Sequence, residues 1–90
     1  MQSLEVDDVR VLVVEDESYL AEAIATGLRR ETMAVDVAGD GAEALAQVEI
    51  ADYDVVVLDR DLPGVHGDEV CARLAREHPD VKVIMLTAAR

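Results

Sequence analysis

Four short runs of apolar residues recur along the chain, and within each run the apolar residues are nearly continuous instead of alternating with polar ones. This pattern is typical of strands in a parallel sheet that is covered on both faces, because side chains on opposite faces are then both buried. The predicted strands span residues 9–14, 33–37, 54–58 and 81–86.

Helical patterns fill the intervals between these runs, and the first spans residues 17–30. Apolar residues recur there every four positions, which places them on one face of a helix. The residues expected to dock on the sheet are Leu20, Ala21, Ile24, Ala25 and Leu28.

The second helical pattern starts after Asp40, which is expected to cap the first turn, with Glu43 completing a capping box. The third pattern spans residues 68–77 and is ended by Pro79, which cannot continue a helix. The inward-facing residues of these two helices are expected to be Ala44, Leu45, Val48, Val70, Cys71 and Leu74.

Strands and helices therefore alternate along the whole chain, with short links and no internal repeat. This order predicts one α/β domain with a doubly wound parallel sheet, since right-handed crossovers place helices on both faces. Ligands bind such sheets beyond the carboxyl ends of the strands. The residues that follow each strand are therefore the first candidates for chemistry.

Acidic residues follow two of the predicted strands. Glu15 and Asp16 follow the first strand, Asp59 follows the third, and the hydroxyl of Thr87 follows the fourth. If the first and third strands are neighbours, three carboxylates converge and repel one another unless a cation lies among them. Oxygen ligands without a His or Cys cluster favour Mg²⁺, with Mn²⁺ or Ca²⁺ as alternatives. Each acid alone also fits a solvated loop residue, and Asp16 fits a cap of the first helix.

Composition narrows the range of functions. The chain has 90 residues, 2% of them aromatic, so one small aliphatic core is expected. The net charge of −12 opposes binding of this segment to nucleic acid or to an anionic membrane. The single cysteine cannot form an internal disulfide, and we find neither a signal peptide nor an apolar run of membrane-spanning length. A cytoplasmic protein is expected.

The two histidines are expected to play no part in metal binding. His66 lies in the turn after the third strand, and His78 precedes a proline. Neither has a partner ligand at metal-binding spacing in the sequence. Both are therefore expected to be exposed.

Four motifs in order resemble the receiver domain of bacterial two-component response regulators, nearest to the OmpR/PhoB type. They are VLVVEDE, AGDGAEAL, VVVLDRDLPGVHG and VIMLTA. The resemblance implies a flavodoxin-like doubly wound parallel sheet of strand order 2-1-3-4. It also implies a partial receiver domain at residues 9–90, after an acidic extension at residues 1–8. The family's fifth strand and last two helices are missing from these residues.

The resemblance implies a role for each candidate site residue. Asp59 is implied to be the phosphoacceptor, which takes a phosphoryl group from a sensor histidine kinase. Mg²⁺ is implied to be held by Glu15, Asp16, Asp59 and the backbone carbonyl of Asp61. Thr87 would hydrogen-bond the phosphoryl group and move on activation.

The same resemblance implies a signalling role instead of enzymatic turnover. The domain would catalyse only its own phosphorylation and dephosphorylation, and would switch a downstream domain that binds DNA and regulates transcription. The family's phosphoryl-binding lysine ends the missing fifth strand, and Lys82 lies at the wrong end of the sheet to replace it. The fourth strand is expected to be an aliphatic edge through which the chain could dimerise or aggregate.

Three alternatives remain open from the sequence. Asp59 and Asp61 also resemble the Asp-x-Asp motif of haloacid-dehalogenase-type phosphatases, although Leu-Pro-Gly follows in this chain and further motifs of that family are missing. Glu15 with the same two aspartates would fit a Toprim-like Mg²⁺ site for phosphodiester chemistry, which the charge of the chain opposes. The third alternative is a metal-independent interaction module of the same shape.

Overall fold

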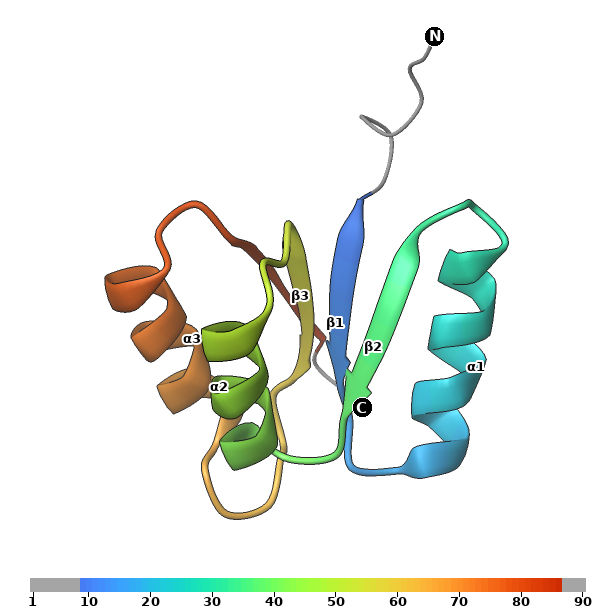
Figure 1. Cartoon of the computed structure of the whole chain (residues 1–90). Helices are drawn as coiled ribbons and strands as arrows, with labels where there is room; N and C mark the ends of the chain where they lie inside the picture. Colours follow the sequence, from blue (N-terminus) through green and yellow to red (C-terminus); the bar gives the residue numbers. More distant parts are fainter. Residues whose placement is uncertain (1–8, 87–90) are drawn as a thin grey trace, which may run out of the picture.

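The computed structural model describes residues 9–86, in which four strands and three helices alternate (Figure 1). The strands are β1 (Arg10–Val14), β2 (Ala34–Ala38), β3 (Val55–Asp59) and β4 (Lys82–Leu86). The helices are α1 (Ser18–Arg29), α2 (Gly41–Ile50) and α3 (Gly67–Glu77). The order predicted from the hydrophobic pattern is confirmed, with several ends shifted by one residue.

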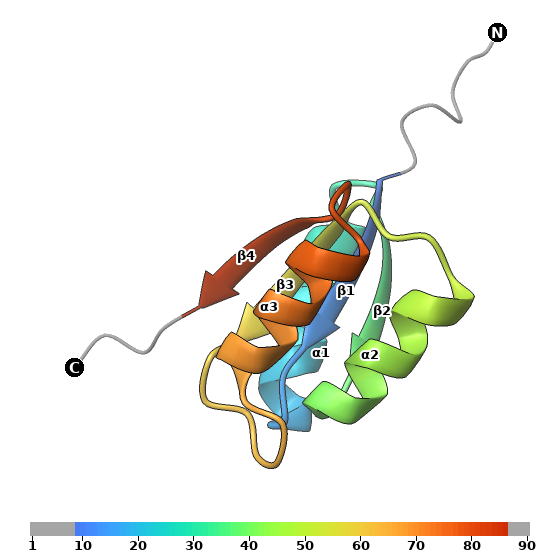
Figure 2. The ribbon, with the colours of Figure 1, turned by 90° about the vertical axis from the view of Figure 1, so that its left-hand side faces the viewer.

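The four strands form one parallel sheet in the order β2-β1-β3-β4. The expected order 2-1-3-4 is therefore confirmed, and β1 and β3 lie side by side at the centre. Their register places Val14 beside Leu58, so both strands end at the same edge of the sheet. Helices α2 and α3 cover one face and α1 covers the other (Figure 2), which is the doubly wound arrangement.

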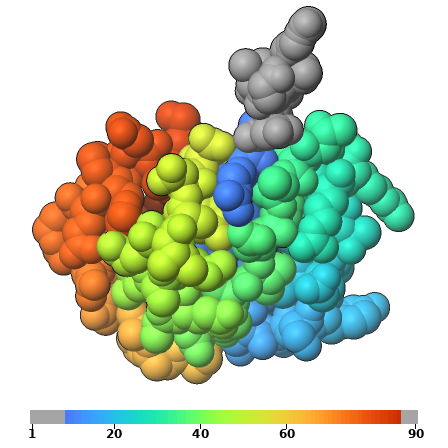
Figure 3. Space-filling view, in the orientation of Figure 1, coloured from blue at the N-terminus to red at the C-terminus, as the bar shows by residue number. Residues whose placement is uncertain are grey.

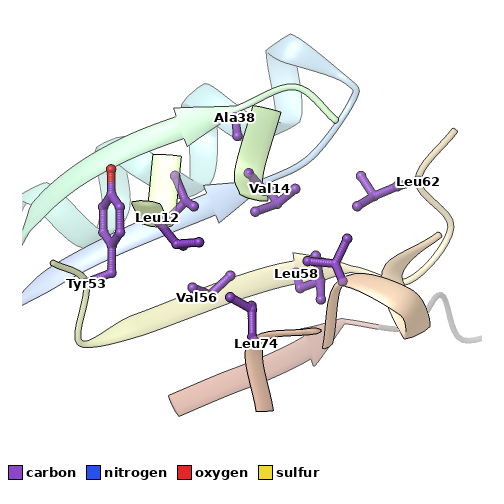
Figure 4. Close-up of a cluster of buried hydrophobic side chains, with 11 residues drawn as sticks. Leu12, Val14, Ala38, Tyr53, Val56, Leu58, Leu62 and Leu74 are labelled. Carbon is purple, nitrogen blue, oxygen red and sulfur yellow. The ribbon is translucent and has the colours of Figure 1, made fainter. Parts of the chain in front are cut away.

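The larger of two aliphatic clusters lies between the sheet and the helices α2 and α3 (Figure 4). Leu12, Leu58 and Leu74 meet there and are at most 1% exposed. Burying a leucine side chain fully contributes about 1.5–3 kcal/mol, so this cluster holds α2 and α3 against the strands. In the space-filling view, atoms of these helices lie in front of the sheet, and blue atoms of β1 show only between neighbouring segments (Figure 3).

The smaller cluster lies under α1, which packs through small residues. Ala21 and Ala25 are completely buried, whereas Leu20 is 42% exposed. The predicted docking face is therefore wrong at Leu20. Because alanines at the centre of the contact let the helix approach the sheet closely, the first-turn leucine lies at the flank of the contact instead of inside it.

The start of α2 has the predicted cap. The carboxylate of Asp40 accepts a hydrogen bond from the backbone N–H of Glu43 at 2.8 Å. The Glu43 carboxylate accepts one in return from the N–H of Gly39, also at 2.8 Å. The first bond satisfies a backbone donor that the helix itself leaves unpaired, and the second ties the residue before the cap to the first turn.

Strand β4 lies at an edge of the sheet and pairs only with β3 within residues 9–86. Ile84 is 52% exposed and Leu86 is 40% exposed, so the expected aliphatic edge is present. Self-association through this edge stays a prediction. In the part of the chain that the structure describes, every helix is too short or too polar to cross a membrane.

Candidate metal centre at the carboxyl ends of the strands

The candidate site lies where β1 and β3 end, at the lower edge of the sheet in Figure 1. Glu15 follows the last residue of β1, and its N–H still bonds to the carbonyl of Ala38 at 3.0 Å. Asp59 is the last residue of β3 and pairs with Leu86 of β4. Sheet pairing therefore fixes the backbone of both acids before any side-chain contact is considered.

Glu15, Asp16 and Asp59 each offer a carboxylate oxygen, and these three oxygens lie within 4.8 Å of one another. The predicted convergence of the three acids is confirmed. Glu15 is buried, Asp59 is half-buried and Asp16 is exposed, so the group opens to solvent on one side. We call these three residues the acid cluster.

The acid cluster fits a small hard cation. Mg²⁺ binds oxygen at about 2.0–2.1 Å in an octahedron, which places neighbouring ligand oxygens about 3 Å apart. The three oxygens lie within 4.8 Å of one another, so small side-chain rotations or an intervening water would let them share one ion. The members of the acid cluster are all carboxylates, which are ligands of the kind that Mg²⁺ prefers.

Electrostatic crowding falls mainly on Glu15. Burial raises the pKa of its carboxyl group, and the neighbouring charges of Asp59 and Asp16 raise it further. A hydrogen bond from the backbone N–H of Glu17, at 3.1 Å, acts in the opposite direction. A cation in the cluster would relieve the remaining repulsion.

The side chain of Asp59 has a defined orientation. Its Oδ1 atom accepts a hydrogen bond from the backbone N–H of Asp61 at 3.0 Å, as in an Asx turn.

The Asp61 carboxylate itself lies outside the acid cluster, which contains Asp16 instead. This arrangement opposes both enzyme alternatives, because an Asp-x-Asp phosphatase and a Toprim-like site each need the second aspartate at the metal or the reaction. The backbone carbonyl of Asp61 as a metal ligand stays a prediction.

A tight loop between β3 and α3 supports Asp59. Gly67 approaches the chain so closely that an added Cβ would lie 2.7 Å from the Cα of Arg60 and 2.7 Å from the carbonyl oxygen of Asp59. Leu62 anchors the same loop in the core at 1% exposure, and Gly64 adopts a positive φ of 72°. Loop, strand end and helix start therefore form one packed unit around the acid.

Asp16 does not cap α1, although its position just before the helix allows such a cap. The N-cap residue is Glu17, and no side chain caps this helix. The carboxylate of Asp16 therefore belongs to the acid cluster and does not cap the helix. Thr87 lies outside the described residues, so its predicted role stays a prediction.

The histidine prediction is wrong for His78. Its side chain is only 26% exposed, and its Nε2 atom lies 3.0 Å from a carboxylate oxygen of Glu49. Glu77 completes a second group of possible metal ligands at this position. No signal in the sequence points to Glu49, which is 29 residues away, because only the packing of α2 against α3 brings it there.

Comparisons with known proteins agree with this arrangement. The family model described as the response regulator receiver domain matches residues 11–90. Transcriptional regulatory protein CutR of Streptomyces coelicolor is 63% identical over 81 residues, which cover 90% of this chain and 37% of CutR. The chain thus spans little more than a third of the length of this relative.

Solved structures show the same fold. The response regulator protein TrrA of Thermotoga maritima, in complex with Mg²⁺ and BeF, superimposes with a TM-score of 0.86 at 38% identity. That match covers 90% of this chain and 70% of the TrrA chain. A second TrrA structure, in complex with the histidine kinase ThkA, gives a TM-score of 0.84 and covers 91% of this chain and 71% of the other.

Proposed function

This chain belongs to the response regulator receiver domain family, and we propose that Asp59 is its phosphoacceptor, with a Mg²⁺ site formed by Glu15, Asp16, Asp59 and the carbonyl of Asp61. The observation that carries the proposal is the convergence of three carboxylates within 4.8 Å at the carboxyl ends of two central strands. The complex of the related TrrA with Mg²⁺ and BeF supports it.

For phosphoryl transfer the protein mainly has to position the nucleophile and to stabilise negative charge. A carboxylate oxygen of Asp59 attacks the phosphorus of a phosphohistidine, a P–O bond forms, and the P–N bond breaks with the electron pair leaving on the imidazole. A bound Mg²⁺ would neutralise negative charge on the phosphoryl oxygens and on the carboxylates. The hydrogen bond from the Asp61 N–H holds the nucleophile in place. The domain would catalyse only its own phosphorylation and dephosphorylation.

A sensor histidine kinase is the proposed donor, and the complex between TrrA and the kinase ThkA supports this partner. The surface beside the acid cluster suits a protein partner. On α1, Tyr19 is 89% exposed and Leu20 is 42% exposed, so apolar side chains are exposed three and four residues after Asp16. Apolar groups of this kind contribute to protein interfaces when they are covered.

The output is proposed to be transcriptional, in a regulator of the OmpR/PhoB type. The relative CutR is named a transcriptional regulatory protein. Because its net charge is −12, this chain would leave contact with DNA to another domain of a longer protein. Such a regulator would work in the cytoplasm, where the kinase domain and DNA are both accessible.

The experiment is labelling with acetyl phosphate and Mg²⁺, followed by intact-mass measurement. We expect at most one phosphoryl group per chain, and this label should be lost on Asp59→Asn and on removal of Mg²⁺ with EDTA. Asp61→Asn should keep the label, because only its backbone is proposed to contribute. Labelling that persists in Asp59→Asn would refute the proposal. Loss of labelling in Asp61→Asn would revive the Asp-x-Asp alternatives.

A further inference from the structure

A second group of metal-binding side chains lies at the opposite end of the sheet, near the top of Figure 1, where α2 and α3 end. Glu49 is in the last turn of α2, Glu77 is the last residue of α3, and His78 is the residue that ends this helix. Their ligand atoms lie within 4.8 Å of one another. We call them the helix-end group. The phosphoacceptor chemistry makes no use of them.

His78 makes contacts through both its backbone and its imidazole ring. The N–H of His78 bonds to the carbonyl of Leu74 at 2.7 Å, and its own carbonyl accepts the N–H of Val81 at 3.1 Å. Its Nε2 atom lies 3.0 Å from a carboxylate oxygen of Glu49. The ring therefore lies with a nitrogen close to carboxylates of two helices.

The two carboxylates are free to adjust. The side chain of Glu49 is 62% exposed and that of Glu77 is 41% exposed. An oxygen of Glu77 lies 3.4 Å from the Nε atom of Arg73, but the contact does not have hydrogen-bond geometry. An exposed pair of this kind is weak, and a carboxylate with two oxygens can keep it while binding a cation.

The surroundings favour positive charge. Both helices present their C-terminal ends, where unpaired carbonyls carry partial negative charge. The last turn of α2 has no basic residue to balance this charge, and that of α3 has one, Arg76. A hollow of about 360 Å³ beside Glu77 and His78 is also lined by Asp52 and Asp80. It leaves space for water molecules that would complete the coordination of an ion.

We propose that Glu49, Glu77 and His78 bind a first-row transition metal, Zn²⁺ in the first instance, which ties the end of α2 to the end of α3. An imidazole among the ligands favours Zn²⁺ over Mg²⁺ and Ca²⁺. In this respect the helix-end group differs from the acid cluster, which offers oxygen alone.

The geometry needs only small changes. Zinc binds nitrogen and oxygen at about 2.0–2.1 Å, so neighbouring ligands of a tetrahedral ion lie roughly 3.3 Å apart. The 3.0 Å separation of His78 Nε2 and Glu49 is already close to that value. The Glu77 oxygen lies within 4.8 Å of the other two ligand atoms, so a side-chain rotation would bring it to a shared ion. Nε2 gives up any proton that it shares with Glu49 and binds the metal as neutral imidazole.

The test is a calorimetric titration of the 90-residue chain with Zn²⁺, in a large excess of Mg²⁺ that occupies the acid cluster. We expect one Zn²⁺ per chain with micromolar affinity. His78→Gln should weaken binding at least about tenfold, and Glu49→Gln should weaken it by a similar factor. His66→Gln is the matched control, because His66 immediately precedes α3 and its side chain forms no cap. Its zinc affinity should equal that of the unchanged chain.

Two further measurements keep the result unambiguous. Cys71→Ala should retain zinc binding, which excludes the only thiol of the chain. Thermal melting without metal shows that each variant is folded, and Zn²⁺ should raise the melting temperature of His66→Gln but not of His78→Gln.

NMR of the imidazole nitrogens then locates the ion. Zinc should shift the Nε2 signal of His78 and leave that of His66 in place. Absence of zinc binding in Mg²⁺, equal affinity of His78→Gln and His66→Gln, or loss of binding in Cys71→Ala would overturn the proposal.

Discussion

Each end of the sheet gathers three side chains of the types that bind metals, but the two groups form by different means. At the carboxyl end, Glu15, Asp16 and Asp59 extend from neighbouring strands whose pairing fixes their backbone. At the other end, the helix-end group extends from two helices that pack through apolar side chains, and most of it is exposed. The first arrangement is built into the backbone, and the second depends on side-chain positions.

This difference explains why only one group could be found from the sequence. Strand ends in a parallel sheet meet at one edge, so acids that follow strands converge by topology. Helix ends meet only if the helices are neighbours and are in the right rotation, which apolar periodicity does not fix. The carboxyl end should therefore respond most to changes in the backbone, and the other end most to changes in single side chains.

The largest expected effect is that of Gly67→Ala at the carboxyl end. A Cβ there would lie 2.7 Å from backbone atoms of residues 59 and 60, and backbone cannot move aside cheaply. We expect a loss of about 2–3 kcal/mol in the free energy of unfolding, and slower labelling of Asp59. Gly27→Ala, in α1, is the control: a Cβ there meets nothing within 4 Å, and a gain of about 0.5–1 kcal/mol is expected. Urea denaturation measures both, and equal values would contradict the backbone argument.

At the opposite end, Tyr53→Phe should show how far single side-chain bonds hold the fold. The Tyr53 hydroxyl donates to the carboxylate of Asp36 at 2.6 Å and accepts from the amide of Gln47 at 3.2 Å. We expect a loss of about 1.5–2 kcal/mol at pH 7. Tyr19→Phe is the control, because Tyr19 is 89% exposed, and a change within about 0.5 kcal/mol is expected.

The same tyrosine predicts a pH dependence. Burial, followed by the Asp36 carboxylate, raises the pKa of Tyr53 to about 12. The folded chain then holds a proton that the unfolded chain loses near pH 10, so this residue makes stability fall as pH rises from about 10 towards 12. Urea denaturation between about pH 10 and pH 12 measures the free energy of unfolding. It should fall more steeply with pH in the native chain than in Tyr53→Phe. An equal fall in the two chains would refute the assignment of this pH dependence to Tyr53.

The next effect concerns cation affinity. Asp16→Asn removes one of three charges from the acid cluster and should weaken Mg²⁺ binding about tenfold. Asp80→Asn, which changes the net charge equally at the other end of the sheet, should leave it within about twofold. Titration calorimetry with Mg²⁺ compares the two. An equal loss would mean that overall charge, and not the cluster, attracts the ion.

The smallest effect is expected from Glu15→Gln without metal. Because burial and neighbouring acids raise the pKa of Glu15, its ionised form destabilises the folded chain at pH 7, and protonation relieves this as pH falls through the raised value. Glu15→Gln should therefore be more stable than the native chain at pH 7, with a smaller advantage at pH 5. Glu31→Gln is the control, because Glu31 is exposed. Urea denaturation at pH 7 and pH 5 measures the free energy of unfolding of each variant. A destabilised Glu15→Gln would contradict the account.

Much of the fold is predictable because its signals are local. Continuous aliphatic runs indicate buried parallel strands, and Asp40 with Glu43 marks the start of α2 correctly. Leu20 is misplaced because periodicity predicts the apolar side of a helix but not the centre of its contact. The predicted exposure of His78 is wrong because its partner comes from another helix.

Sequence alone determined the order of elements, the parallel sheet and the acids at its carboxyl end, since each depends on hydrophobic runs and on residues adjacent to them. Tertiary structure decided which of the acids share one small volume, that Asp16 and not Asp61 completes the cluster, and that Glu49 meets His78. The physical reason is distance along the chain: local preferences act over a few residues, whereas these contacts depend on how packed helices and paired strands are placed against one another.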